Sequence, residues 1–178
     1  MQIVKLQSLI RTIPDYPKPG IQFRDITTLL RDPKGLQLAV DGIADRHRAS
    51  EIDVVVGIEA RGFIFGTAVA YSLGCGFVPL RKPGKLPGRT IGRSFDLEYG
   101  SDRIEIHVGA VEPRTRVLLV DDLIATGGTA AAAIELLNEV GADVIECAFV
   151  VALPELGGVA RLERLGCPVH WLCEFAGE

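Results

Sequence analysis

Continuous hydrophobic runs alternate along this chain with segments in which hydrophobic residues recur every three or four positions. Runs of this kind, rich in β-branched residues, are typical of strands that are covered on both faces. They predict five strands, at 52–58, 76–80, 116–122, 144–153 and 168–175. The pattern therefore predicts a sheet that is buried between layers of helices.

The segments between these runs have the periodicity of helices. Helices are expected over 3–12, from Asp32-Pro33 to about His47, and over 63–74, 129–140 and 157–165. Strands that alternate with helices predict an α/β fold with a central, mainly parallel sheet flanked by helices. The chain has no internal repeat or low-complexity linker, so we expect a single domain over residues 1–178.

Two segments interrupt this alternation. Three prolines and a glycine within 14–20 force an extended connection. Residues 81–96 are rich in Gly, Pro, Lys and Arg and predict a long mobile loop. SFDLEYG (94–100) and DRIEIHV (102–108) predict antiparallel strands that flank a turn at Gly100-Ser101.

The composition is that of an ordinary globular protein. Of the 178 residues, 48% are hydrophobic and 24% are charged, and the net charge is −4. This charge disfavours a nucleic-acid partner, and no hydrophobic run approaches the ~18 residues of a membrane span. The N-terminal MQIVKLQSLIRTI lacks the apolar core of a secretory signal. We therefore expect a cytoplasmic protein that binds neither nucleic acid nor membranes.

The cysteines and histidines give no sign of a metal site. The four cysteines (75, 147, 167 and 173) lack CxxC spacing and have mostly apolar neighbours. They are interpreted as reduced core residues. The three histidines do not cluster in the sequence, so no metal ligand is assigned to the protein.

The chemically most specific segment follows the run at 116–122. It begins with two adjacent acids, Asp121 and Asp122, and continues into small residues: Ala125, Thr126, Gly127, Gly128 and Thr129. Small residues at a helix N-terminus expose backbone N–H groups to a phosphate, and threonine hydroxyls add donors. The acids would repel a phosphate, so we expect them to accept hydrogen bonds from sugar hydroxyls. The motif predicts a site for a phosphorylated ribose.

The motif differs from two other nucleotide-binding loops and from a simple helix cap. The segment contains neither the GxxxxGK[ST] of a P-loop nor GxGxxG. For either acid alone, a capped helix behind an acidic loop is the simpler explanation. The whole pattern, with both acids directly before a phosphate cradle, favours the sugar-phosphate site.

VLLVDDLIATGGT (117–129) resembles the phosphoribosyl-pyrophosphate (PRPP) signature of the type I phosphoribosyltransferases. The segments PDYPKPGIQFRDIT, VVGIEARGFIFG, PLRKPGKLPG and SFDLEYG extend the resemblance over essentially the whole chain, to the adenine phosphoribosyltransferases. This resemblance implies the type I fold, with a small N-terminal base-binding hood (1–32) and a flexible lid loop (81–102). It also implies a glycosyltransferase of purine salvage: adenine and PRPP give AMP and pyrophosphate, with Mg²⁺, in a homodimer.

EARG (59–62) lies between a predicted strand and a predicted helix, where Arg61 and the turn could hold a second anion. Taken alone, Arg61 would equally suit a surface salt bridge. The resemblance assigns this loop to the pyrophosphate of PRPP. It also implies an unusual backbone there, with a cis peptide at Glu59–Ala60.

Five cations lie between 81 and 93. For Arg81, Lys82 and Lys85 the resemblance implies contacts with pyrophosphate, partly across a dimer interface. Arg89 and Arg93 are interpreted as residues of a solvated loop. A mobile Gly- and Pro-rich loop suits a lid that closes over a water-sensitive intermediate.

Glu98 lies in LEYG beside the predicted loop. Loss of pyrophosphate from the anomeric carbon creates a ribosyl cation, and the attacking base must lose a proton. A nearby carboxylate could stabilise the cation and accept the proton. The resemblance gives this catalytic role to Glu98 and suggests that Tyr99 helps to close the lid. Without it, Glu98 would be a surface residue of a strand.

The base pocket is expected at IQFRDI (21–26), after a rigid Pro-Gly turn. Phe23 could stack on a purine, and backbone groups near Gln22 and Arg24 could hydrogen-bond to its edge. The resemblance implies that this segment binds adenine. The alternative for Phe23 is a core aromatic residue.

Two rival functions share parts of this pattern. The first is the same transfer to hypoxanthine, guanine or xanthine, which FRDI and LEYG disfavour. The second is a PRPP-sensing regulator, which would need a DNA-binding domain and a basic face. The resemblance places Mg²⁺ chiefly on the pyrophosphate oxygens, in keeping with its tendency to retain waters.

Overall fold

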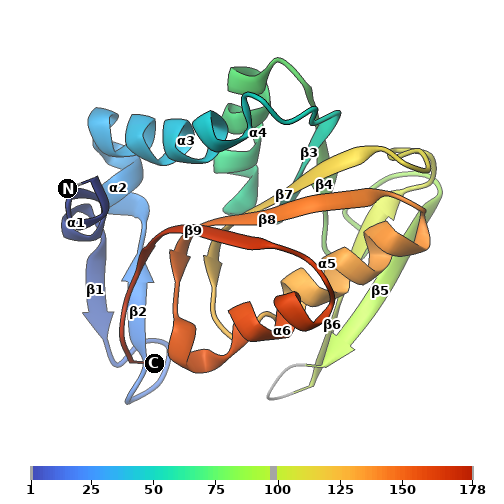
Figure 1. The fold of residues 1–178 in the computed structure, drawn as a ribbon. Helices are drawn as coiled ribbons and strands as arrows, with labels where there is room; N and C mark the ends of the chain where they lie inside the picture. The colour runs from blue at the N-terminus through green and yellow to red at the C-terminus, as the bar shows by residue number, and fades with distance from the viewer. Residues whose placement is uncertain (1, 97–99, 178) are drawn as a thin grey trace.

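The centre of the molecule is a five-stranded parallel sheet (Figure 1). The computed structural model describes residues 2–96 and 100–177. In spatial order the strands are β4 (Gly76–Leu80), β3 (Val54–Ile58), β7 (Arg116–Ile124), β8 (Asp143–Ala152) and β9 (Val169–Glu174). The predicted α/β fold with a central parallel sheet is confirmed.

The inner strands are buried as their hydrophobic runs predict, whereas the two edge strands are less so. Every residue of β3 is buried. In β4 only Leu80 is fully buried, because this strand has a neighbour on one side only. The prediction that 76–80 is covered on both faces was therefore wrong for most of its length.

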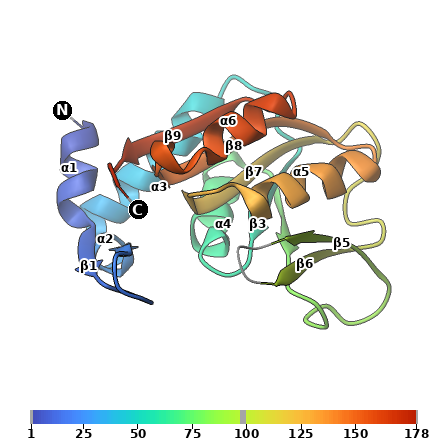
Figure 2. The ribbon, with the colours of Figure 1, turned by 90° about the horizontal axis from the view of Figure 1, so that it is seen from below.

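Helices cover both faces of the sheet (Figures 1 and 2). One face packs against α3 (Pro33–His47) and α4 (Gly62–Leu73), with α1 (Gln2–Leu9) beside β9. The other face packs against α5 (Gly128–Glu139) and α6 (Gly158–Arg164), with the short 3₁₀ helix η1 (Pro154–Leu156) before α6. Two separate hydrophobic clusters therefore hold the sheet from its two sides.

A small N-terminal unit stands beside one end of the sheet (Figure 1). It contains the antiparallel pair β1 (Arg11–Pro14) and β2 (Gln22–Asp25), followed by α2 (Thr27–Arg31). The predicted helix over 3–12 is shorter, because a proline at 14 disfavours helical backbone at the residue before it. The chain instead extends from Arg11 and pairs with β2.

A second antiparallel pair lies at the opposite end of the molecule (Figure 2). Its strands are β5 (Thr90–Asp96) and β6 (Ser101–His107). The long loop predicted over 81–96 was wrong from residue 90 onward, where β5 begins, whereas the antiparallel strands predicted around Gly100-Ser101 are confirmed. The lid role of 81–102 stays a prediction. Ile91 and Phe95 lie on the same face of β5, because they are an even number of positions apart, and both pack on the core. These contacts stabilise the strand. Only 81–89 connects β4 to β5, and its mobility stays a prediction.

All four cysteines lie within the described residues, and each is a free thiol, as expected. Three of them are buried and Cys75 is half-buried. Of the helices that residues 2–96 and 100–177 form, none has the length and apolar character to cross a bilayer.

Candidate active site

The two motifs found in the sequence meet at the carboxyl ends of β3 and β7. In parallel α/β sheets this edge is where ligands bind. Gly62, the first residue of α4, lies directly beside Asp121 near the end of β7. A Cβ atom on Gly62 would approach Asp121 Oδ1 and the Val120 carbonyl to 2.8 Å, which is too close for any other residue. The glycine of EARG therefore brings the two motifs together.

Of the paired acids, Asp122 is buried and Asp121 is half-buried, and both are incompletely partnered. Asp122 is 4% exposed, and its carboxylate lies 2.7 Å from Arg61 Nε. Asp121 Oδ1 accepts a hydrogen bond from the backbone N–H of Asp122. Burial raises the pKa of Asp121, and the neighbouring charge of Asp122 raises it further. Burial also raises the pKa of Asp122, although Arg61 opposes that shift. A ligand that donates hydrogen bonds to these two carboxyl groups would stabilise their charged forms.

The turn between β7 and α5 has the geometry of an anion cradle. Gly127 has φ 72°, a left-handed conformation that glycine adopts without strain, and α5 begins at Gly128. A cavity of about 140 Å³ opens above the turn and is lined by Asp121 and residues 123–130. The N-terminus of α5 and the exposed Thr126 would face an anion that binds there.

Gly158, at the start of α6, supports this turn from behind. Its backbone N–H donates to the carbonyl of Ala125 at 3.0 Å. A Cβ on Gly158 would lie 2.3 Å from that same carbonyl oxygen. Sequence reasoning missed Gly158, because nothing in its local pattern indicates that it packs on a turn thirty residues away.

A second cavity, of about 170 Å³, adjoins the first at Asp121 and Thr129. Its charged lining consists of Glu59, Arg61, Lys82, Asp102, Asp121 and Asp122. The Glu59–Ala60 peptide is cis, as the resemblance implied. Asp102 was not predicted as a site residue.

Glu59 holds the first two residues of the 81–89 connection beside this second cavity. Arg81 donates to both oxygens of Glu59 at 3.2 Å, and the Lys82 backbone N–H donates to the same carboxylate. Burial would raise the pKa of Glu59, but the hydrogen bonds from Arg81 and Lys82 outweigh it and lower that pKa. Lys82 Nζ lies 2.9 Å from Asp102. Lys85 accepts from Arg81 through its carbonyl and lies outside the lining of the cavity.

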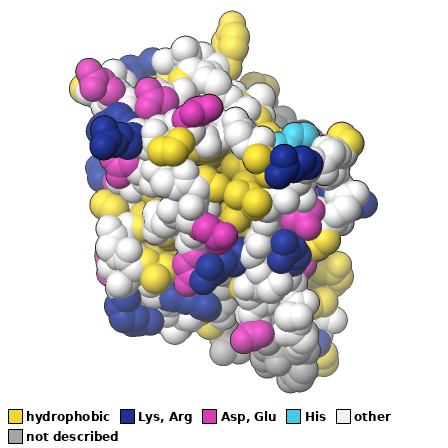
Figure 3. Space-filling model, turned by 90° about the vertical axis from the view of Figure 1, so that its right-hand side faces the viewer, with side chains coloured by type: hydrophobic (Ala, Val, Ile, Leu, Met, Phe, Trp, Pro, Cys, Tyr) yellow, Lys and Arg dark blue, Asp and Glu magenta, His cyan; other side chains and the backbone are white. Residues whose placement is uncertain are grey.

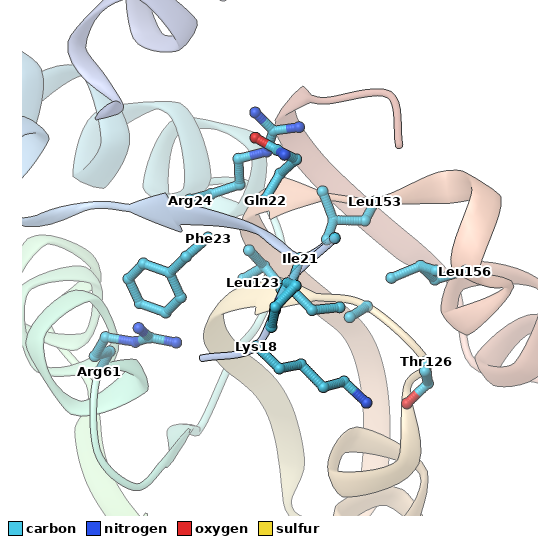
Figure 4. A pocket seen from close by; sticks show the side chains of 13 residues that line it. Lys18, Ile21, Gln22, Phe23, Arg24, Arg61, Leu123, Thr126, Leu153 and Leu156 are labelled. Carbon is cyan, nitrogen blue, oxygen red and sulfur yellow. The ribbon is translucent and has the colours of Figure 1, made fainter. Parts of the chain in front are cut away.

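The third and largest cavity, of about 460 Å³, is mainly apolar (Figure 4). Six of its lining residues were predicted from the base segment, the EARG turn and the small-residue turn: Gln22, Phe23, Arg24, Arg61, Ala125 and Thr126. Sequence reasoning missed Lys18, Leu123, Leu153 and Leu156, whereas Ile21 lies in the predicted base segment. The three leucines share one signal, which is their place: Leu123 lies near the carboxyl end of β7, and Leu153 and Leu156 follow that of β8, where α/β sheets hold ligands.

Phe23 faces this cavity rather than the core. Figure 4 shows its ring on the side of Arg61, whose guanidinium carbon lies 5.7 Å from the ring centroid. Tyr16 packs edge-on against the ring at 5.2 Å. The ring therefore has a fixed position from which it can contact a planar ligand.

Arg24 lines the cavity, but its side chain points away from Phe23 and Arg61, on the same side as that of Gln22 (Figure 4). Its guanidinium donates to Thr12 and to the carbonyl of Ala176, and it stacks on Phe175. Burial lowers the pKa of this guanidinium. Only the backbone of Arg24 is thus available to a ligand, in line with the expectation of backbone recognition.

Two predicted site residues, Glu98 and Tyr99, lie outside the described residues. Arg93 was interpreted as a residue of a solvated loop, and that was wrong. It lies in β5, and its Nε is 2.7 Å from Glu135 of α5. It therefore ties the β5–β6 pair to the helix that follows the phosphate turn.

Within the described residues, no three His, Cys, Asp or Glu side chains are arranged to hold a metal ion. The second cavity nevertheless offers carboxylates beside cations. This donor set suits Mg²⁺ that arrives on substrate phosphates with its waters, rather than a protein-held ion.

On the face shown in Figure 3, Lys and Arg side chains are interspersed with Asp and Glu around small hydrophobic patches. This face carries mixed charge, unlike the basic surface of a protein that binds DNA.

Known proteins resemble this chain over nearly its whole length. A family model described as a phosphoribosyl transferase domain matches residues 25–162. An adenine phosphoribosyltransferase of Nitrosospira multiformis is 61% identical over 174 residues, which is 98% of this chain and 99% of that protein. A crystal structure of adenine phosphoribosyltransferase from Rhodothermus marinus has a TM-score of 0.91 at 49% identity, with 98% of each chain covered.

A further structure shows what one such protein binds. Adenine phosphoribosyltransferase from Saccharomyces cerevisiae, complexed with an imino-altritol bisphosphate and adenine, has a TM-score of 0.89 at 39% identity. The match covers 96% of this chain and 98% of the yeast chain.

Proposed function

We infer how this site works from the premise that the chain belongs to the adenine phosphoribosyltransferases of the phosphoribosyl transferase family. It transfers the 5-phosphoribosyl group from PRPP to adenine, giving AMP and pyrophosphate. The observation that best supports the residue assignments is that three cavities adjoin one another and share lining residues. The base and phosphate cavities share Thr126, the base and second cavities share Arg61, and the second and phosphate cavities share Asp121.

Each cavity suits one part of the two substrates, according to the polarity and charge of its lining. The apolar cavity beside Phe23 takes adenine, since a flat base stacks well on an aromatic ring. The turn at 125–129 takes the 5-phosphate, because its backbone N–H groups lie at a helix N-terminus. The second cavity takes the pyrophosphate with Arg61, Arg81 and Lys82.

Asp121 lines both the second and the phosphate cavity, and Asp122 lines the second, so we assign both acids to the ribose that joins the two phosphate groups. Ribose hydroxyls would donate to these carboxylates and favour their charged forms, which burial disfavours in the free protein. Lys85 is assigned to the pyrophosphate side of the loop by resemblance. Gln22 and Arg24 are assigned to the adenine edge through backbone groups.

The reaction displaces pyrophosphate from the anomeric carbon of the ribose. We assign to Glu98 the stabilisation of the resulting positive charge and the acceptance of the adenine proton. We assign Tyr99 to lid closure together with the 81–89 connection. Mg²⁺, bound to PRPP, would neutralise the leaving pyrophosphate, and the carboxylates of the second cavity would face its waters.

A homodimer is proposed as the working form. The outer face of α4 exposes Ile64 and, seven residues later, Tyr71, which is 89% exposed. Residues seven apart lie on one helix face, so this apolar strip suits a second copy of the chain. Because α4 begins at Gly62 in the site, a partner there could reach the lid. The free thiols favour a cytoplasmic setting.

The most direct test offers PRPP and Mg²⁺ with adenine, hypoxanthine, guanine or xanthine, and detects nucleotides by mass spectrometry. AMP is the expected product, with the other bases at least about 100-fold less efficient. Product from another base alone would contradict the assignment of the base cavity. No nucleotide from any base would favour the PRPP-sensing regulator.

The role of Glu98 has a separate test. The Glu98→Gln variant should lose turnover by about 100-fold or more, while the Kd of PRPP changes by less than about threefold. Unchanged turnover would remove Glu98 from the catalytic residues. The Glu112→Gln variant, which changes an exposed turn residue, is the matched control.

A further inference from the structure

Each cation at the second cavity is paired with an acid in the free protein. Arg61 pairs with Asp122, and Arg81 pairs with Glu59. The third pair joins Lys82 to Asp102 across the gap between the 81–89 connection and β6. An incoming pyrophosphate must therefore share or displace a carboxylate at every cation that it contacts.

Asp102 is the acid of this group that no role yet explains. It lies on β6 opposite Phe95, and its side chain is 26% exposed. The hydrogen bond from Lys82 holds the pKa of Asp102 below its usual value, so this carboxylate is charged at neutral pH. Its hydrogen bond with Lys82 keeps Nζ at the cavity. Without this bond, the flexible lysine side chain would adopt many conformations in solvent.

The lining of the cavity carries more acids than bases. Four carboxyl groups and two cationic side chains line it, and Arg81 lies next to this lining, hydrogen-bonded to Glu59. A bare pyrophosphate carries several negative charges and would be repelled by the acids. The same group with a bound divalent cation presents positive charge to the carboxylates and oxygens to Lys82 and Arg61.

We propose that Asp102 is a specificity-determining residue that makes the second cavity select metal-bound over metal-free pyrophosphate groups. This inference rests on the proposed assignment of pyrophosphate to that cavity. Asp102 acts in two ways: its charge disfavours the bare anion, and its contact with Lys82 keeps the ammonium in place for the metal complex. Loss of the charge should therefore improve binding of the bare anion without improving binding of the metal complex.

The test measures equilibrium binding of pyrophosphate by calorimetry, once with excess EDTA and once with excess Mg²⁺. In the wild-type protein the Mg²⁺ condition should give the lower Kd. In Asp102→Asn, the Kd without metal should fall roughly three- to tenfold, since one like charge near the anion is removed. The Kd with Mg²⁺ should stay within about twofold or rise. A Kd ratio equal to that of the wild type would overturn the proposal.

Two further variants keep this test decisive. Asp102→Ser should behave as Asp102→Asn does, and it serves if the asparagine variant does not fold. Glu112→Gln removes the same charge from an exposed turn outside the cavity, so its Kd ratio should match the wild type. An equal shift in this control would assign the effect to net charge and overturn the role of Asp102.

AMP formation from adenine and PRPP is measured on the same wild-type preparation. Absence of AMP would contradict the proposed function, whereas the pyrophosphate comparison would remain readable. A wild-type protein that makes AMP but binds pyrophosphate equally well in EDTA and in Mg²⁺ would contradict only the inference about Asp102.

Discussion

Two buried acidic sites on neighbouring strands of the same sheet have opposite electrostatics. Glu146, near the start of β8, is 5% exposed, and Asp122, near the end of β7, is 4% exposed. Arg46 donates to both carboxylate oxygens of Glu146, with the shortest contacts at 2.7 and 2.8 Å, and His47 Nε2 lies 2.9 Å away. Burial would raise the pKa of Glu146, but these partners lower it to about 2. Asp121 and Asp122 have raised pKa values instead.

The difference lies in how many partners the protein itself supplies. Around Glu146 the protein provides the donors that a buried carboxylate needs, so the group links α3 to β8 and stabilises the fold. Around Asp121 and Asp122 a single guanidinium faces two carboxyl groups. Acids that are removed from water and lack hydrogen-bond donors destabilise the folded state unless a ligand supplies those donors. Such acids are typical of functional sites. The comparison thus separates structural from functional acids without reference to any relative.

The largest expected effect is that of Asp121→Asn. The change removes a charged acceptor for the ribose, so kcat/KM for PRPP should fall about 100-fold. It also removes a half-buried like charge beside Asp122, so the free energy of unfolding should rise by about 1 kcal/mol. Steady-state kinetics and urea unfolding measure the two effects. A loss of both activity and stability would break the comparison, because Asp121 would then be structural.

The second prediction concerns Glu146→Gln. This variant leaves Arg46 and His47 without their carboxylate, so the free energy of unfolding at pH 7 should fall by about 2 kcal/mol. Because Glu146 lies away from the three cavities, kcat/KM for PRPP should stay within about twofold of the wild type. Urea unfolding and kinetics below the melting temperature check both values. A large loss of activity in a folded variant would contradict the assignment.

The third prediction is a pH dependence of opposite sign at the two sites. The pKa of Glu146 is lowered from 4.5 to about 2, so its stabilisation is complete above pH 4.5 and is lost as the pH falls toward 2. The deficit of Glu146→Gln should therefore close over that range. The raised pKa of Asp121 means that its carboxyl destabilises the protein at neutral pH and ceases to do so once protonated. The advantage of Asp121→Asn should therefore shrink as the pH falls toward 3.8.

Unfolding curves of the wild type and both variants from pH 7.5 downward measure these differences. His170 also titrates against this background, since burial lowers its pKa, but each subtraction from the wild type largely removes its contribution. Differences that stay constant with pH would show that neither carboxyl has the shift described.

The smallest effect is expected for Arg46→Gln. Arg46 is half exposed, so water replaces part of its interaction with Glu146, and His47 remains as a partner. The free energy of unfolding should fall by about 1 kcal/mol, less than for Glu146→Gln. An equal or larger fall would mean that the stability of this site depends on the guanidinium rather than on the carboxylate.

Sequence reasoning reached the fold and the anion sites because their signals are local. The hydrophobic runs located all five strands of the sheet, and the motif at 121–129 is contiguous in the chain. Two predictions were inaccurate: the helix over 3–12, which ends before Pro14, and the loop over 81–96, in which Ile91 and Phe95 pack on the core as part of a strand. Short strands with two or three packed side chains resemble loops in composition.

The rest of the site could not be predicted, because it is assembled from distant segments. The base cavity combines residues 18–24, 123–126 and 153–156, and only the fold brings them together. Leucines that line a cavity look like any other core leucines. Asp102 is equally inconspicuous in the sequence, since only its distance from Lys82 reveals its place at the site.

One contact described above also bears on the order in which the protein takes shape. Arg24 donates to the carbonyl of Ala176, across 152 positions of the chain. The phosphate turn, in contrast, is hydrogen-bonded to residues that all precede β9. On the ribosome, where chains emerge from the N-terminus, the phosphate turn can form while β9 is still unmade. The base pocket is therefore the last part of the site to mature, and a nascent chain should bind a sugar phosphate before it binds adenine.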